Sequence, residues 1–182
     1  MIKNIVIPMA GLGTRFKKNN FSTIKPLIKI DNKSILEESI KSLPSGRSKY
    51  CVLQKNIFDR YGLIKKILRK NRISPFLLEE ETLGQSDTCN KVIDLVSKEE
   101  DLFIHSCDYI MKFSKKKFSK LCKNSDVLIF TYRLKSTIVK DYKDFAYCSI
   151  KNGLVDKITE KTLISKKPYD DHMVVGTFWF KK

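Results

Sequence analysis

The sequence lacks the features that define several common classes of protein. No stretch approaches the roughly 18 consecutive apolar residues of a membrane-spanning helix, and the first apolar run is short, broken by Pro8 and without a cleavage-site pattern. We therefore expect neither a membrane span nor a signal peptide. The five cysteines are scattered, odd in number and never spaced as Cys-x-x-Cys. This usage argues against a disulfide framework or a zinc site and favours reduced thiols in a cytoplasm.

Arginine is scarce although the chain is strongly basic. The 182 residues include 30 lysines and 6 arginines, and the formal net charge is +16. One interpretation is an anionic partner such as a nucleotide, a nucleic acid or a membrane surface. The other is a lysine-rich composition whose charges lie on solvated faces. Surfaces that read bases favour arginine for its bidentate fork, so a nucleic-acid partner is the less favoured interpretation.

The apolar pattern predicts strands that alternate with helices in one domain. Strands are predicted over residues 5–9, 27–30, 50–54, 76–78, 102–105 and 127–132, and helices over 34–43, 56–70, 85–96 and 114–123. Ser34 and Glu37 form a capping-box pattern at the start of the first helix. Later, Asn152-Gly153 predicts a hairpin turn, and residues 174–180 a last strand. This order predicts an α/β fold with a mostly parallel sheet covered on both faces and an antiparallel late portion.

A glycine loop follows the first strand, where ligands bind in parallel sheets. It is neither a Walker loop nor a dinucleotide fingerprint, since Phe16 stands where a third glycine would be needed. Small residues such as Gly11 and Gly13 let backbone N–H groups approach a polyphosphate, and Arg15 can bind its oxygens bidentately. Two glycines in a turn are equally compatible with a plain turn.

The run Ala10-Gly11-Leu12-Gly13-Thr14-Arg15-Phe16, followed by Lys25-Pro26-Leu27-Ile28, resembles the signature of the sugar-phosphate nucleotidyltransferases. It looks most like the branch found in capsule and surface-polysaccharide gene sets, which includes cytidylyltransferases. The similarity extends to the family's second nucleotide loop, its metal-binding aspartate, its acceptor-binding Glu-Lys and its late glycine-aromatic strand. The matching residues are Thr82-x-Gly84 with Thr88, Cys107-Asp108, Gly153-x-Val155 leading to Ile158-Thr159-Glu160-Lys161, and Gly176-Thr177-Phe178.

The resemblance implies a Rossmann-like three-layer αβα sandwich with a mixed, mostly parallel sheet, of the nucleotide-diphospho-sugar transferase type. It implies Mg²⁺-dependent transfer of an NMP group from a nucleoside triphosphate, CTP favoured, to a small phosphorylated acceptor, with release of pyrophosphate. The acceptor classes are sugar 1-phosphates and phosphocholine-like or phosphoglutamine-like compounds, for capsule or surface-glycan biosynthesis.

The resemblance also implies a role for each matching residue. Arg15 would hold the departing pyrophosphate, Lys25 the α-phosphate and Asp108 the Mg²⁺ ion, which prefers oxygen ligands. Glu160 would bind a hydroxyl or amine of the acceptor, Lys161 its phosphate, and Gly176 would lie at the acceptor side. Nucleotide binding is expected from Met9, Ala10, Gly11, Leu12, Gly13, Thr14, Arg15, Lys25, Thr82, Gly84, Thr88 and Asp108.

Each of these residues also has a purely structural interpretation. Lys25 is one of many lysines, Asp108 follows a strand as turn formers do, and Glu160-Lys161 resembles an exposed charge pair. Thr82, Gly84 and Thr88 fit the start of a helix. The two histidines are not interpreted as metal ligands. His105 is expected in the core or in contact with residues of the site, and His172, beside Asp170 and Asp171, in a polar loop.

The chain departs from the family pattern at three places. Ile24 replaces the first proline of Pro-Lys-Pro, Ala146 stands near a frequent glycine, and the sequence stops at Lys182, before the segment that carries the family's second acidic metal ligand. We therefore expect a single nucleotidyltransferase domain, residues 1–182, that lacks the family's carboxyl-terminal end. Self-association through the apolar last strand is a further expectation. The alternative is a noncatalytic or truncated nucleotide- or nucleic-acid-binding protein.

Overall fold

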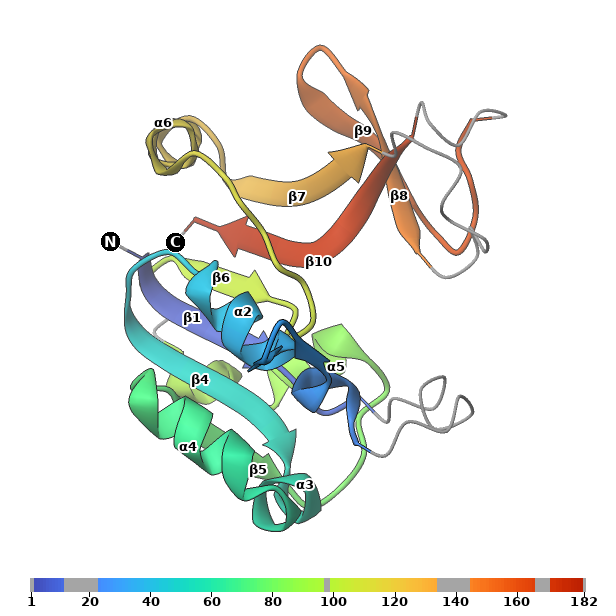
Figure 1. The fold of residues 1–182 in the computed structure, drawn as a ribbon. Coiled ribbons are helices and arrows are strands. Elements are labelled where there is room, and N and C mark those ends of the chain that lie inside the picture. Colours follow the sequence, from blue (N-terminus) through green and yellow to red (C-terminus); the bar gives the residue numbers. More distant parts are fainter. Residues whose placement is uncertain (1, 12–22, 97–98, 134–144, 166–170, 182) are drawn as a thin grey trace. The chain divides into compact units, whose positions relative to one another are not determined.

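The computed structural model describes residues 2–11, 23–96, 99–133, 145–165 and 171–181 (Figure 1). The chain forms two compact units. The first comprises Met1–Leu128 and Phe178–Lys182, and the second Ile129–Thr177. Among the described helices, none has the length and apolar character needed to span a bilayer.

The first unit is built on a parallel sheet centred on β1 (Ile2–Pro8). This strand pairs in parallel with β4 (Gly46–Gln54) on one side and with β6 (Leu102–His105) on the other. Beyond β4 lies β5 (Ser74–Leu78), also parallel. Residues 5–7 of β1 are almost completely buried, as expected for a strand covered on both faces. The predicted parallel sheet is confirmed.

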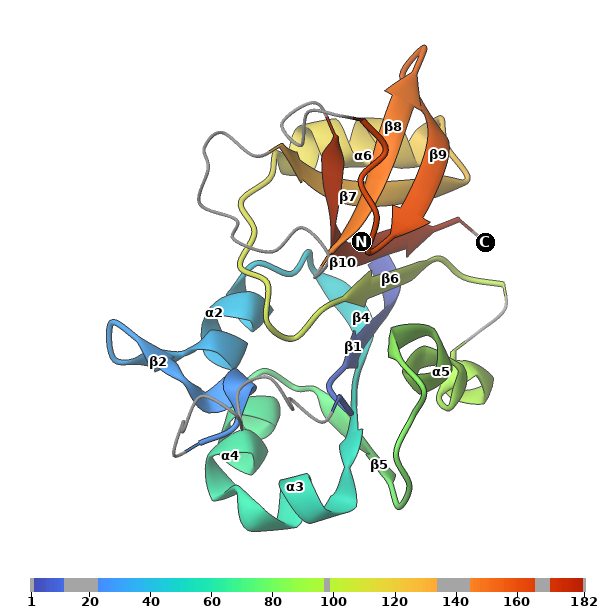
Figure 2. The ribbon, with the colours of Figure 1, turned by 90° about the vertical axis from the view of Figure 1, so that its right-hand side faces the viewer.

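Helices cover both faces of this sheet. Figure 2 shows α2 (Ile35–Lys41) and α4 (Gly62–Lys70) on one side of β1 and β4, and α5 (Gln85–Asn90) on the other side. The chain therefore has the predicted Rossmann-like arrangement of three layers with a mixed, mostly parallel sheet.

Each face of the parallel sheet has its own apolar core. The face toward α5 buries a cluster formed by Val6, Ala10, Val52, Leu78, Val92 and Val96, against which Cys89 packs. Cys51 precedes Val52 on β4 and therefore points to the opposite face, because side chains alternate along a strand. Burial raises the pKa of the Cys51 and Cys89 thiols to about 12 in each case.

Three predicted elements differ from the structure. The predicted helix 56–70 is interrupted at Tyr61, whose backbone is not helical (φ −111°, ψ 89°), and consists of α3 (Lys55–Arg60) and α4. Of the predicted helix 85–96, only the part that forms α5 is α-helical, and Ile93–Leu95 form a separate 3₁₀ turn, η2.

The third difference concerns the predicted extended segment 27–30. It begins instead as a 3₁₀ turn, η1 (Lys25–Leu27), and continues as β2 (Lys29–Ile30), which pairs with β3 (Lys33–Ser34). Pro26 lies within the turn, where its fixed φ suits helical geometry and its missing N–H leaves no bond unmade.

The start of α2 is fixed by its capping residues. Ser34 Oγ accepts a hydrogen bond from the Glu37 backbone N–H (3.2 Å), and the Ser34 N–H donates to Glu37 Oε2 (2.9 Å). The predicted capping box is therefore confirmed. The Ile35 N–H also donates to the Ile28 carbonyl (2.9 Å), which ties α2 to the segment that follows η1.

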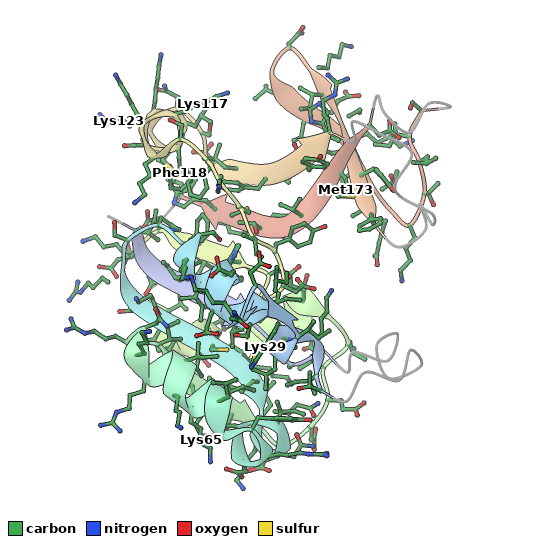
Figure 3. All side chains as sticks on the ribbon, in the orientation of Figure 1. Lys29, Lys65, Lys117, Phe118, Lys123 and Met173 are labelled. Carbon is green, nitrogen blue, oxygen red and sulfur yellow. The ribbon has the colours of Figure 1, made fainter. Side chains whose placement is uncertain are left out.

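A lysine-rich helix, α6 (Lys115–Lys123), begins at the predicted cap Ser114, which accepts a hydrogen bond from the Lys117 N–H (3.2 Å). Figure 3 labels Lys117 and Lys123 among the exposed lysines of this helix and Phe118 among its inward side chains. Phe118 packs edge-on against Phe103, with 5.8 Å between the ring centroids. The helix is anchored by its aromatic side and leaves its lysines in solvent.

The second unit is antiparallel. Strands β8 (Ala146–Lys151) and β9 (Leu154–Glu160) form a hairpin, and β10 (His172–Phe180) pairs with β8, while β7 (Val127–Arg133) pairs with β10. The turn residues Asn152 and Gly153 have φ values of 52° and 79°, as a two-residue hairpin turn of type I′ requires. The predicted hairpin and last strand are confirmed.

Candidate functional site

Asp108 and Lys25 form an ion pair in the first unit. β6 ends at His105, and Asp108 lies in the turn that follows it, where the Tyr109 N–H donates to the Ser106 carbonyl (3.4 Å). Lys25 Nζ contacts Asp108 Oδ2. Two residues selected separately from the sequence thus meet beyond the carboxyl end of a parallel strand, the usual location of ligands in such sheets.

The Asp108 carboxyl group is held in its ionised form. Burial alone would raise its pKa, but hydrogen bonds from Lys25 and from Ser106 Oγ, together with the charge of Lys25, lower the pKa below its ordinary value of 3.8. Ser106 was not predicted as a site residue. Its position at the start of the turn, where serine is common, is the only signal that the sequence offers.

The donor set around Asp108 fits a shared Mg²⁺ ion. Mg²⁺ is usually bound by one or two carboxylates, water and substrate phosphates rather than by a cage of protein ligands. A carboxylate offers about four lone-pair directions, so the contacts of Asp108 with Lys25 and Ser106 leave directions for an ion. Within the described ranges no group of three His, Cys, Asp or Glu residues could hold a metal.

Only the start of the predicted glycine loop lies among the described residues. Met9 and Ala10 are buried, and the Met9 N–H donates to the Val52 carbonyl (2.7 Å). At Gly11, which is exposed, the space that a side chain would enter is open. The remaining loop residues lie outside the described part of the chain, and their nucleotide role stays a prediction: Leu12, Gly13, Thr14 and Arg15.

The predicted second nucleotide loop is held in shape by hydrogen bonds of its own side chains. Thr88 is buried, and its Oγ1 donates to the Gly84 carbonyl (2.8 Å) and lies 2.7 Å from Thr82 Oγ1. The Leu83 N–H donates to Asp87 Oδ2 (2.9 Å). These bonds agree with the interpretation of the segment as a helix start, and its nucleotide-binding role stays a prediction.

The predicted acceptor residues lie in the second unit. The side chains of Glu160 and Lys161 are 77% and 69% exposed, and Lys161 Nζ lies 3.5 Å from Glu160 Oε1. The Lys161 N–H donates to the Phe145 carbonyl (2.8 Å). Gly176 has a φ of 65°, a backbone conformation that glycine adopts readily. A solvated pair and an acceptor site are both compatible with this exposure.

The polar residues around His172 have structural partners. His172 Nδ1 lies 3.1 Å from Thr131 Oγ1. Asp171 is buried and accepts hydrogen bonds from the backbone N–H groups of Ile164 (2.8 Å) and Ser165 (3.1 Å). Asp171 therefore holds the local backbone. His172 is the first residue of β10 instead of part of the predicted polar loop, and its ring contacts a side chain of β7. Asp170 lies outside the described residues.

Comparison with solved structures shows that the chain shares its fold with a nucleoside-diphosphate-sugar pyrophosphorylase, HddC and a CTP transferase. A nucleoside-diphosphate-sugar pyrophosphorylase from Vibrio cholerae superposes with a TM-score of 0.71 at 18% identity, over 97% of this chain and 72% of that one. HddC from Yersinia pseudotuberculosis superposes with a TM-score of 0.72 at 19% identity, over 99% of this chain and 77% of that one. The inositol-1-phosphate CTP transferase from T. maritima superposes with a TM-score of 0.71 at 15% identity, over 99% of this chain and 71% of that one.

In sequence, the chain is similar to a 2-aminoethylphosphonate cytidylyltransferase from Lancefieldella rimae. The two are 29% identical over 132 residues, which cover 61% of this chain and 52% of the relative. The match thus spans about half the length of that curated relative. No family model matches the chain.

Proposed function

We propose that the chain is a nucleotidyltransferase that transfers an NMP group from a nucleoside triphosphate to a small phosphorylated acceptor. The observation that carries the proposal is the Lys25–Asp108 pair at the carboxyl end of the parallel sheet. A cation beside an ionised, partly buried carboxylate suits a substrate that brings both phosphates and a metal ion. The fold shared with pyrophosphorylases and a CTP transferase supports the same reaction class.

In this reaction an acceptor phosphate oxygen attacks the α-phosphorus of the triphosphate. A new P–O bond forms, and the bond to pyrophosphate breaks. Because the acceptor is already an anion, no protein nucleophile is needed, and catalysis consists of positioning and charge neutralisation. Mg²⁺, which Asp108 would help to hold, would supply positive charge that neutralises the phosphates.

The residues of this chain would divide that work. Lys25 would bind the α-phosphate, exchanging its present partner Asp108 for a phosphate oxygen. Asp108, ionised at neutral pH, would then be free to bind Mg²⁺. Arg15 would hold the pyrophosphate, and Glu160 and Lys161 would bind the acceptor through an amine or hydroxyl and through its phosphate.

CTP is the favoured nucleotide. The proposal is supported by the resemblance of the glycine loop to cytidylyltransferases and by the similarity to a protein described as a 2-aminoethylphosphonate cytidylyltransferase. That description also favours acceptors that carry both a phosphoryl or phosphonyl group and an amine, for which a glutamate beside a lysine is a suitable pair of contacts. We propose a place in capsule or surface-glycan biosynthesis on the family resemblance.

Pyrophosphate release tests the proposal directly. The chain is incubated with Mg²⁺ and each of the four common nucleoside triphosphates, with a panel of acceptors: sugar 1-phosphates, phosphocholine, phosphoglutamine and 2-aminoethylphosphonate. We expect release that requires an acceptor and is highest with CTP. Nucleotide binding without release for any pair, or nucleic-acid binding with a steep salt dependence, would instead favour the noncatalytic alternative.

A further inference from the structure

A buried polar cluster lies directly behind the turn that carries Asp108. Ser39 on α2 and His105 at the end of β6 are both completely buried. Ser39 Oγ lies 3.0 Å from His105 Nε2, and it donates to the Ser106 carbonyl (3.2 Å). Ser42 Oγ lies 3.3 Å from the same ring nitrogen. Polar side chains are rarely buried so completely unless they have partners, and here the partners lead to the candidate site.

The Ser106–Tyr109 turn is held by this cluster at both ends. At its start, the Ser106 carbonyl accepts from Ser39 Oγ as well as from the Tyr109 N–H. At its end, His105 is hydrogen-bonded to the backbone of Tyr109. Within the turn, Ser106 Oγ donates to the Asp108 carboxylate. The backbone on each side of Asp108 is therefore fixed from the protein interior.

The ring of His105 is a neutral structural group in this cluster. Burial lowers its pKa to about 4, against the opposing effects of hydrogen bonds to the backbone of Tyr109 and Ser39 and of the charge on Asp108. Its contacts therefore do not change with pH near neutrality.

Helix α2 is also hydrogen-bonded to the segment that contains Lys25. Ile35, the first residue of α2, donates its N–H to the Ile28 carbonyl (2.9 Å), directly after the η1 turn that contains Lys25. The capping box of Ser34 and Glu37 fixes this end of α2. Helix α2 thus carries bonds to both segments whose side chains form the ion pair, and Ser39 is its link to the aspartate side.

We propose that Ser39 and His105 are positioning residues, which fix the Ser106–Tyr109 turn so that Asp108 faces Lys25. Their importance for a metal-bound nucleotide rests on the function proposed above, whereas their hold on the turn is a property of the protein alone. Displacing a reacting group by ~1 Å can lower a rate by about a hundredfold, so a buried support of this kind has a measurable effect without touching substrate.

Hydrogen–deuterium exchange of the protein without ligand tests the hold on the turn. In Ser39→Ala we expect amides of the peptide 102–112 to exchange about five- to tenfold faster, as the loss of one net hydrogen bond predicts, while amides of β1 and β4 keep their rates. Ser42→Ala is the matched control and should have the smaller effect, since the hydrogen bonds of the Ser42 hydroxyl in the described part of the chain go to His105 and the Ser39 carbonyl, and none goes to Ser106. Unchanged exchange in Ser39→Ala, or equal acceleration across the first unit, would overturn the proposal.

Binding of Mn²⁺ with CTP, followed by electron spin resonance, tests the consequence for the site. Ser39→Ala and His105→Leu should weaken Mn²⁺ binding about tenfold without changing CTP affinity in the absence of metal, and His105→Gln, which keeps a polar group, should restore part of the loss. Wild-type affinity in both Ser39→Ala and His105→Leu would contradict the positioning role. If the wild-type chain binds no Mn²⁺–CTP, the proposed function fails, and the exchange experiment still decides the hold on the turn.

Discussion

Lys25 Nζ and Asp108 Oδ2 are in direct contact, although the two residues belong to a 3₁₀ turn and to a loop far apart in the sequence. The lysine keeps the partly buried carboxyl group ionised. In the proposed reaction the same two groups would bind the α-phosphate and the Mg²⁺ ion. Without substrate, Asp108 therefore neutralises Lys25 as the α-phosphate would, and Lys25 neutralises Asp108 as the Mg²⁺ ion would.

Removal of Lys25 should impair turnover more than nucleotide binding. Its charge matters most while the α-phosphate is in transit, so we expect Lys25→Ala to lower kcat by about a hundredfold or more and to weaken CTP binding by much less. Steady-state kinetics and calorimetry of CTP binding provide the two measurements. Equal losses in both would mean that Lys25 only anchors the nucleotide.

The ion pair should also stabilise the fold in a pH-dependent way. Because the pKa of Asp108 lies below 3.8 in the folded chain, the contribution of the pair is complete above that value and is lost as the pH falls through the folded pKa. We expect Lys25→Met to lower the Tm by about 2–4 °C at pH 7, equivalent to about 1 kcal/mol. The difference should become smaller as the pH falls below 3.8.

Lys29→Met is the control for that experiment, because it removes the same charge from an exposed position on β2. Its Tm should stay close to that of the wild type at both pH values. A Tm difference for Lys25→Met that is as large at pH 3 as at pH 7 would show that the lysine stabilises the fold by other contacts.

The exposed pair Glu160–Lys161 allows a test that does not disturb the core. If these residues bind the acceptor, Glu160→Gln and Lys161→Ala should each raise the acceptor KM about tenfold and leave the CTP KM unchanged. The Tm should not change, because both side chains are largely solvated. A selective loss of CTP affinity would place the pair on the nucleotide side instead.

The hairpin turn offers a test of backbone strain. Gly153 has a φ of 79° and open space where a side chain would lie, so a substitution meets strain without a clash. We expect Gly153→Ala to destabilise the second unit by about 1–2 kcal/mol, measured by thermal unfolding. Gly153→Asn, although larger, should be less destabilising because asparagine tolerates this region. A greater loss with asparagine would point to side-chain crowding.

Gln54, at the end of β4, is a site where a polar atom weakens the core. Its Nε2 atom is buried, and among the residues that the structure describes it has no hydrogen-bond partner. Replacement by methionine, which is similar in shape, should therefore leave the Tm unchanged or raise it, by about 1 kcal/mol of stability at most. Gln54→Glu should lower it, since the substitution buries a charge. A clear loss of stability in Gln54→Met would show that the amide has a partner in solution.

Local patterns were sufficient for much of the fold. The apolar runs of β1 and β6 identify buried strands, the Ser34–Glu37 spacing identifies a helix start, and Asn152-Gly153 identifies a hairpin, because each signal depends on neighbours in sequence. The break at Tyr61 was missed for the same reason. The apolar spacing of α3 continues into α4, so periodicity alone does not reveal a change in backbone direction.

The surroundings of the candidate site could not be predicted in this way. Lys25 and Asp108 were selected from the family resemblance, but nothing local indicates that they touch. Ser39 is an ordinary polar residue within a helix, and its contact with His105 joins positions 66 residues apart. Such buried pairs depend on the tertiary arrangement, which determines whether a serine faces solvent or the core.

The separate cores on the two faces of the parallel sheet give the chain a pair of native chemical reporters. Cys51 lies in one core and Cys89 packs on the other, and at pH 8 a thiol with a pKa near 12 is ionised only about one part in ten thousand. An alkylating reagent can react with the completely buried Cys51 only when the surrounding core opens, whereas the partly buried Cys89 is less protected. The labelling rate of Cys51, compared with that of Cys89 by mass spectrometry, therefore reports how often the helices on its face detach from the sheet.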